Sequence, residues 1–149
     1  MVDHPQLELD AQLCLPLYAA ARGVTRRYAE VLADVGLTYP QYVTMLALWD
    51  AEAPLTVGEV GERLHLDSGT LTPVLKRLEA AGLVVRRRDA ADERRVRVEV
   101  TSRGEAVRAE VADVPERVWH GMGLSVDDAL QLRGLLDRLL LGLDASSSV

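Results

Sequence analysis

The fold is set by residues 55–100, which read LTVGEVGERLHLDSGTLTPVLKRLEAAGLVVRRRDAADERRVRVEV. In the first half of this stretch, apolar residues recur every three or four positions, the spacing of an amphipathic helix. Thr56 and Glu59 are placed as a capping box, which opens a short helix. A three-residue connection at 65–67 leads to a second helix over about 68–81, and Gly82 ends it.

Beyond Gly82 the pattern becomes β-branched and rich in arginine. Residues 83–88 and 96–100 are predicted strands, and the polar residues 89–94 form a long loop between them. Two short helices joined by a tight turn and followed by a β-hairpin make a winged helix-turn-helix. The predicted fold class is therefore mainly α with a small β-hairpin, a winged helix-turn-helix that carries a helical dimerisation layer.

A helix over about 7–34 is predicted before this module. Pro16 removes one backbone donor, so the helix either begins near Cys14, with the proline in its first turn, or is kinked there. A capping pattern at Thr38–Gln41 predicts a further helix over about 39–51.

Two more helices are predicted after the module. Ser102 and Glu105 form another capping box, which starts a helix to about Trp119. Glycines at 121 and 123 break the chain, and a leucine-rich helix follows over about 125–143.

The outer helices carry more leucine than the central module needs for its own core. We therefore expect one compact domain with an N-terminal dimerisation helix at 1–36, a winged helix-turn-helix at 37–104 and C-terminal dimerisation helices at 105–149. A two-fold dimer places two recognition helices about one DNA turn apart, so the expected operator is pseudo-palindromic double-stranded DNA. The alternative is a monomer with a helical cap.

The composition is that of a globular protein, with 48% hydrophobic and 27% charged residues among 149. The chain has neither a signal-peptide pattern nor a run of about 18 apolar residues, so we expect a cytoplasmic protein without a membrane partner. The three histidines are scattered and far from the one cysteine, so no metal site and no cofactor are expected.

The net charge of −6 by itself argues against nucleic acid, but its distribution does not. Residues 76–97 hold eight basic and four acidic side chains, a local balance of +4 that leaves −10 for the rest of the chain. A basic island on an acidic body is typical of a protein with one face toward phosphate. The alternatives are a solvated hairpin, or a winged helix that binds other proteins.

On a helical wheel, the face opposite the apolar stripe of 68–81 is small, then polar, then basic. Small residues let a helix approach base edges, and a threonine offers a hydroxyl and a methyl group to them. Arg94 at the tip of the hairpin can enter a narrow minor groove, with Asp92 holding its guanidinium. The predicted DNA-contacting residues are Ser68, Thr70, Thr72, Lys76, Arg77, Arg86, Asp92 and Arg94.

Three segments carry a resemblance: LCLPLYAAAR at 13–22, LTYPQY at 37–42 and the stretch 55–96. Together they resemble the MarR family, and within it the organic-hydroperoxide-sensing OhrR branch. The resemblance implies that Cys14 is the peroxide-reactive residue. It implies that the hydroxyls of Tyr18, Tyr28 and Tyr39 surround its thiolate, the latter two from the partner subunit.

The resemblance further implies a repressor that leaves its operator when organic hydroperoxide oxidises Cys14. A second cysteine is absent, so the chain resembles the one-cysteine type, in which an external low-molecular-weight thiol or further oxidation traps the first product. The chain also has no phenylalanine to line a peroxide pocket. Candidate replacements are Leu15, Leu17, Met45, Leu46 and Trp49.

Other readings of the cysteine stay open at this level. By itself, a free cysteine on an apolar helix face is more often plain core packing. A MarR-type repressor could instead be released by a reversible small ligand such as a phenolic acid. A thiol peroxidase fits poorly, because the sequence has no resolving cysteine and no conventional set of catalytic residues. We therefore expect that the protein is not an enzyme.

Overall fold

The computed structural model describes residues 4–146 of the chain. The chain divides into two compact units, residues 1–118 and 119–149. The elements of the first unit are α1 (Cys14–Leu32), α2 (Tyr39–Trp49), β1 (Leu55–Thr56), α3 (Val57–Leu64), α4 (Ser68–Ala80), β2 (Val84–Arg88), β3 (Val96–Val100), α5 (Ser102–Glu110) and α6 (Val114–Trp119), which ends one residue past the boundary. The second unit contains α7 (Val126–Ser146).

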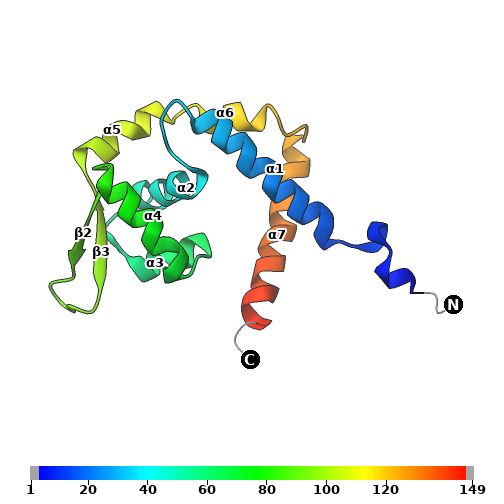
Figure 1. Ribbon diagram of the computed structural model, residues 1–149, viewed down its shortest axis with the longest axis horizontal. Helices are drawn as coiled ribbons and strands as arrows, with labels where there is room; N and C mark the ends of the chain where they lie inside the picture. Colours follow the sequence, from blue (N-terminus) through cyan, green and yellow to red (C-terminus); the bar gives the residue numbers. More distant parts are fainter. Residues whose placement is uncertain (1–3, 147–149) are drawn as a thin grey trace. The chain divides into compact units, whose positions relative to one another are not determined.

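The predicted winged helix-turn-helix is present: α3 and α4 form the helix pair, and β2 and β3 form the wing (Figure 1). The sheet has one strand more than the predicted hairpin. It is antiparallel in the order β1-β3-β2, with Val98 of β3 opposite both Leu55 and Arg86. The extra strand β1 is two residues long, too short for any periodicity to show in the sequence.

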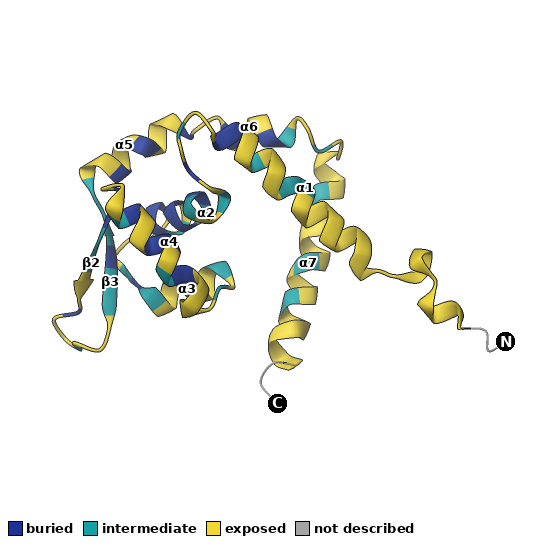
Figure 2. Cartoon of the chain, viewed as in Figure 1, coloured by how far each residue is buried: buried dark blue, intermediate teal, exposed yellow. Residues whose placement is uncertain are grey.

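Helix α2 lies at the centre of this unit, because it packs against α1, α3, α4, α5 and β3. Its side chains at Tyr42 and Met45 are 1% and 0% exposed. Figure 2 shows the buried residues gathered on α2 and on the faces of α3 and α4 that meet it. The apolar stripe predicted for α4 is confirmed, with Leu71, Val74, Leu75 and Leu78 all buried.

Helix α1 begins at Cys14, so the first alternative is confirmed, and the helix from about residue 7 with a kink at Pro16 is wrong. Residues Pro5–Leu7 and Leu9–Ala11 form two short 3₁₀ turns instead. Pro16 is the third residue of α1, where the backbone N–H that proline lacks has no partner within the helix anyway. The proline therefore sits within the first turn of the helix.

The helix predicted from 102 to about 119 is two helices, α5 and α6, with a turn at 111–113. Pro115 explains the break, because its ring would clash with the carbonyl of Val111 in a continuous helix. Helix α7 has no buried residue within the described chain, and most of its leucines are exposed. None of the described helices is long and apolar enough to cross a membrane.

Candidate DNA interface and cysteine site

The amino end of α4 is fixed by Asp67, which caps the helix. The Asp67 carboxylate accepts hydrogen bonds from the backbone N–H of Thr70 at 2.8 Å and from its hydroxyl at 3.1 Å. These hydrogen bonds lower the pKa of Asp67. Ser68, Gly69 and Thr70 are exposed beside the cap. The predicted reading end of the helix is therefore accessible and rigid.

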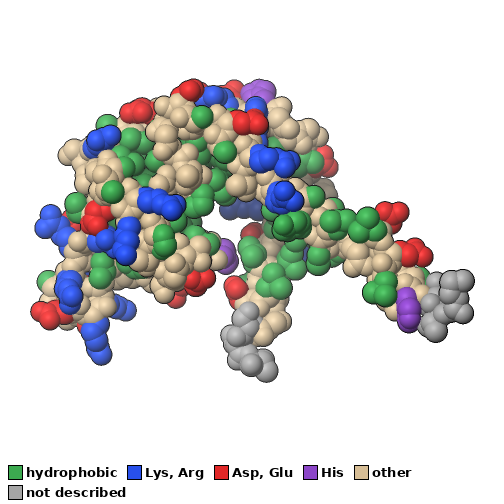
Figure 3. Space-filling model, in the orientation of Figure 1, with side chains coloured by type: hydrophobic (Ala, Val, Ile, Leu, Met, Phe, Trp, Pro, Cys, Tyr) green, Lys and Arg blue, Asp and Glu red, His purple; other side chains and the backbone are tan. Residues whose placement is uncertain are grey.

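The next turn of α4 presents the other predicted contacts. The hydroxyl of Thr72 donates to the carbonyl of Ser68 at 2.6 Å, so its methyl group and its oxygen lone pairs remain for a base edge. Lys76 and Arg77 are exposed further along the helix. Figure 3 shows lysine and arginine side chains gathered over α4 and the wing.

Arg94 lies at the tip of the wing, with a side chain 91% exposed. Its backbone N–H and its guanidinium Nε both donate to one oxygen of Asp92, at 3.1 and 3.2 Å. The hydrogen bond predicted between these two residues is therefore present. It holds the start of the arginine side chain while its far end reaches into solvent.

The base of the wing is held by Asp89 and Arg97, two residues outside the predicted set of DNA contacts. The buried carboxylate of Asp89 accepts from the N–H of Ala91 at 2.9 Å and from Nε of Arg97 at 2.8 Å. Arg97 also donates to the carbonyl of Pro54 at 2.8 Å. The N–H of Ala91, followed by Arg97, lowers the pKa of Asp89. The sequence signal that could have pointed to this contact is Arg97 itself, an arginine among the valines of β3.

Arg86 faces α4 rather than the tip of the wing. Its guanidinium donates to Glu79 at 2.7 and 3.1 Å, and its backbone N–H donates to the same carboxylate at 3.0 Å. The Arg86 hydrogen bonds lower the pKa of Glu79. Arg86 thus ties β2 to the recognition helix, unlike the neighbouring Arg87 and Arg88, which are exposed.

Cys14 is the first residue of α1, and its side chain is exposed. Tyr18 follows one turn later and is 62% exposed, with the guanidinium of Arg22 over its ring at 5.6 Å. The neighbouring leucines at 13, 15 and 17 are also exposed. The start of α1 is therefore an uncovered apolar end that carries the thiol.

The other two predicted tyrosines lie elsewhere. The rings of Tyr28 on α1 and Tyr39 on α2 are stacked at a tilt, with centroids 4.3 Å apart. Fourteen residues of helix separate Tyr28 from Cys14, about 21 Å at the rise of an α-helix. One chain by itself therefore does not bring Tyr28 or Tyr39 to the thiol.

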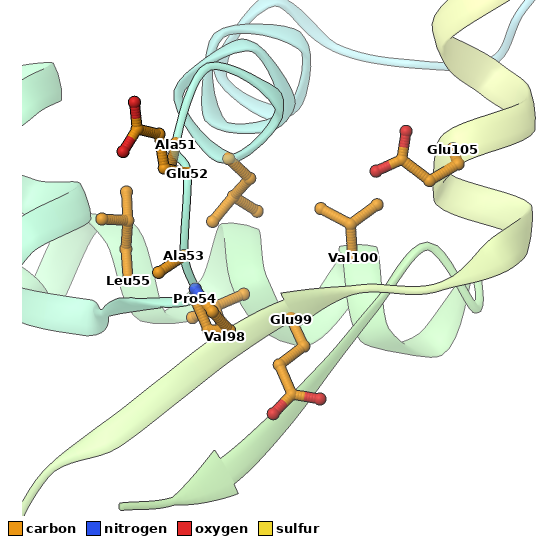
Figure 4. A pocket seen from close by; sticks show the side chains of 10 residues that line it. Ala51, Glu52, Ala53, Pro54, Leu55, Val98, Glu99, Val100 and Glu105 are labelled. Atoms are coloured by element: carbon orange, nitrogen blue, oxygen red, sulfur yellow. The ribbon is translucent and has the colours of Figure 1, made fainter.

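The residues suggested as lining of a peroxide pocket fall into a buried group and an exposed group. Met45 and Trp49 are buried in the core, whereas Leu15, Leu17 and Leu46 are about 40% exposed. A pocket of about 320 Å³ lies between the end of α2, β3 and α5 (Figure 4). Glu99 at its edge is paired with Arg87. Cys14 does not line this pocket.

A winged helix-turn-helix with an exposed recognition helix and an arginine-tipped wing defines a DNA-binding regulator. The profile of the family described as Transcriptional regulator SarA/Rot matches residues 26–111. The chain belongs to the MarR/SarA-type family of transcriptional regulators.

Two characterised relatives match nearly the whole chain. One is the HTH-type transcriptional regulator TtmR of Methylorubrum extorquens (strain PA1), 48% identical over 137 residues, which are 92% of this chain and 68% of TtmR. The other is the organic hydroperoxide resistance transcriptional regulator of Bacillus subtilis (strain 168), 43% identical over 138 residues, which are 93% of this chain and 92% of the relative.

Among solved structures, reduced AbfR bound to DNA matches with a TM-score of 0.77 and 34% identity, covering 93% of this chain and 96% of AbfR. AbfR, a protein of Staphylococcus epidermidis, has also been solved in an overoxidized form bound to DNA and in a disulfide form. The chain is thus similar to regulators solved on DNA and in several oxidation states.

Proposed function

We propose that this chain is a transcriptional repressor that leaves its operator when an organic hydroperoxide oxidises Cys14. The observation that carries the proposal is the lone thiol, exposed at the first residue of α1 with Tyr18 one turn away. The thiolate is the form of a cysteine that attacks a peroxide. The similarity to the Bacillus subtilis organic hydroperoxide resistance regulator supports the same function.

The proposed repressor works as a homodimer. The exposed apolar start of α1 and the exposed leucines of α7 are surfaces that a second copy would cover. In that dimer, Tyr28 and Tyr39 of the partner subunit complete the site around Cys14. The two recognition helices then meet a pseudo-palindromic operator, with Ser68, Thr70 and Thr72 toward base edges and Arg94 toward the minor groove.

The chemistry consists of two steps. The Cys14 thiolate attacks one peroxide oxygen, the O–O bond breaks, and the released alkoxide takes up a proton, which leaves an alcohol and a sulfenic acid. A low-molecular-weight thiol then condenses with the sulfenic acid to form a mixed disulfide and water, or a second hydroperoxide oxidises it further. No other cysteine is present in the chain to form an internal disulfide.

Release follows from strain at the interface. An adduct or a higher oxide adds volume and polarity between two packed subunits, and overpacking of this kind costs about 1–3 kcal/mol. A tenfold loss of affinity corresponds to about 1.4 kcal/mol. Such strain, acting in both subunits, is enough to shift the spacing of the two recognition helices and to lower operator affinity.

The test compares wild type with Cys14→Ser in an operator-binding assay, before and after stoichiometric cumene hydroperoxide, with intact-mass analysis of the same samples. The wild type should gain oxygen or thiol mass and lose the operator, whereas Cys14→Ser should bind DNA normally and stay bound. Release of Cys14→Ser by the hydroperoxide would falsify the mechanism. Release of thiol-blocked protein by a phenolic acid would favour a reversible-ligand repressor instead.

A further inference from the structure

Three tyrosines of one chain form a cluster between α1 and α2. Tyr28 lies 4.3 Å from Tyr39 and 5.7 Å from Tyr42, measured between ring centroids. Tyr28 and Tyr39 are half-buried, whereas Tyr42 is 1% exposed and belongs to the core. The Tyr28 ring therefore contacts both the half-buried ring of Tyr39 and a third ring that is buried in the core.

We infer that Tyr42 is a positioning residue: its buried ring holds Tyr28 in place, keeps Tyr28 stacked on Tyr39, and couples the movement of Tyr28 to α2. The inference rests on the proposed function, which assigns Tyr28 and Tyr39 to the oxidised site. Tyr42 itself does not reach the surface, so it acts through the other two rings.

The start of α2 is the rigid side of this cluster. Thr38 and Gln41 form a complete capping box, and the N–H of Tyr42 donates to the carbonyl of Thr38 at 2.9 Å. Tyr39 and Tyr42 are therefore carried on one fixed helical turn. Tyr28 belongs to α1, so a displacement of α1 changes its ring contacts with both.

Helix α2 connects the tyrosine cluster to the helix-turn-helix formed by α3 and α4. It packs against α3 and α4, and its capped first turn carries two of the three rings. A change at Tyr28 is thus transmitted through Tyr42, as well as through Tyr39, to the helix on which the recognition helix rests. Without the Tyr42 ring, the Tyr28 ring loses its buried support and can repack without moving α2.

The environment also keeps the three phenols protonated. Burial raises the pKa of all three, and the nearby phenol groups raise the pKa of Tyr28 and Tyr42 further. A neutral hydroxyl can donate a hydrogen bond to a thiolate, and an ionised one cannot. Tyr42 therefore contributes to the burial that keeps Tyr28 and Tyr39 as donors.

The first experiment compares Tyr42→Met, which fills the core without a ring, with Tyr42→Phe, which keeps the ring. In Tyr42→Met, the rate of Cys14 oxidation by cumene hydroperoxide should fall about fivefold or more, because misplaced donors lose much of their effect. Tyr42→Phe should restore the rate to within about twofold of wild type. Leu48→Ala is the matched control, since it weakens the core elsewhere on α2 and should leave the rate unchanged.

The second experiment needs no destabilising variant. The chain contains four tyrosines, so protein labelled with 3-fluorotyrosine gives four ¹⁹F resonances, assigned by single Tyr→Phe changes. On oxidation of Cys14, the Tyr42 resonance should shift together with those of Tyr28 and Tyr39. An unmoved Tyr42 signal, or an unchanged oxidation rate in folded Tyr42→Met, overturns the positioning role.

The two ideas fail in different ways. If wild-type protein stays on its operator after Cys14 is oxidised, the proposed function is wrong whatever Tyr42 does. If wild type is released normally and Tyr42→Met is oxidised and released at the same rate, the proposed function stands and the positioning role alone is lost.

Discussion

At the scale of single residues, Arg94 and Asp92 show how local chemistry prepares a contact. Because Asp92 already holds Nε, the Arg94 side chain gives up less conformational freedom when its outer nitrogens meet DNA. Arg86 and Arg94 are both among the predicted DNA contacts, but their surroundings in the folded chain differ. The guanidinium of Arg86 is paired with Glu79, whereas the side chain of Arg94 extends into solvent.

Replacement of Arg94 by alanine should weaken operator binding by about 1–3 kcal/mol, because a minor-groove arginine is lost. Arg108→Ala on α5 removes the same charge from another exposed position and should change affinity much less. Fluorescence anisotropy with labelled operator at fixed salt measures both. Equal losses in the two variants would show that net charge, and not the wing tip, is responsible.

Gly104 on α5 occupies a place where the chain has no room for a side chain. A methyl group there would collide with the carbonyl oxygen of Leu83 and lie 2.7 Å from a Val100 methyl. Gly104→Ala should therefore lower the free energy of unfolding by about 2–3 kcal/mol. Gly58→Ala meets nothing closer than 4.0 Å and should be neutral or stabilising by about 0.5 kcal/mol. Urea denaturation compares the two, and similar stabilities would contradict the packing argument.

At the scale of elements, the Arg86–Glu79 ion pair between β2 and α4 makes the stability of the winged helix-turn-helix depend on pH. Arg86 holds the pKa of Glu79 below its ordinary value in the folded protein. A lowered folded pKa means that the stabilisation is present above the unfolded pKa and is lost as pH falls through the folded one. The loss therefore begins below about pH 4.5, the ordinary value for glutamate.

The prediction is a difference between wild type and Glu79→Gln. Both keep the other low-pKa carboxylates of the module, Glu59, Asp67 and Asp89, so their contributions cancel. The unfolding free energy of Glu79→Gln should fall less steeply than that of wild type as pH drops from neutral to about 3. Denaturant titrations at several pH values test this, and parallel curves would show that the tie contributes nothing.

At the scale of the whole molecule, α7 is the element whose partner has to come from elsewhere in the proposed assembly. Its leucines at 130, 135, 141 and 143 are more than half exposed. An amphipathic helix with no buried face gains stability only when another surface covers it. The proposed dimer supplies that surface and makes DNA binding depend on association.

Leu135→Asp should dissociate the proposed dimer and reduce operator affinity about tenfold or more, because two linked half-site contacts become independent. Arg133→Asp introduces the same side chain two residues earlier, on another side of the helix, and should stay dimeric. Light scattering after size-exclusion chromatography gives the mass, and a gel-shift assay gives the affinity. A dimer of Leu135→Asp with normal affinity would remove α7 from the interface.

Local chemistry was enough to predict the winged helix-turn-helix, the capping boxes at Thr38 and Thr56, and the four buried residues of α4. These features depend on neighbours three or four positions away, which any reader of the sequence can see. The strand β1, the partner of Arg86 and the Asp89–Arg97 contact needed the folded chain, because each joins residues that periodicity does not relate. The break before Pro115 was visible in principle and was missed.

The same division applies to the cysteine site. The sequence singles out Cys14, Tyr18, Tyr28 and Tyr39 through their spacing and their resemblance to a family. Tertiary structure decides that the first two share an exposed helix end, whereas Tyr28 and Tyr39 stack on each other elsewhere, with Tyr28 also against Tyr42. The physical reason is that a rigid helix keeps Cys14 and Tyr28, fourteen positions apart, from meeting, so the proposed contact between them requires a second chain.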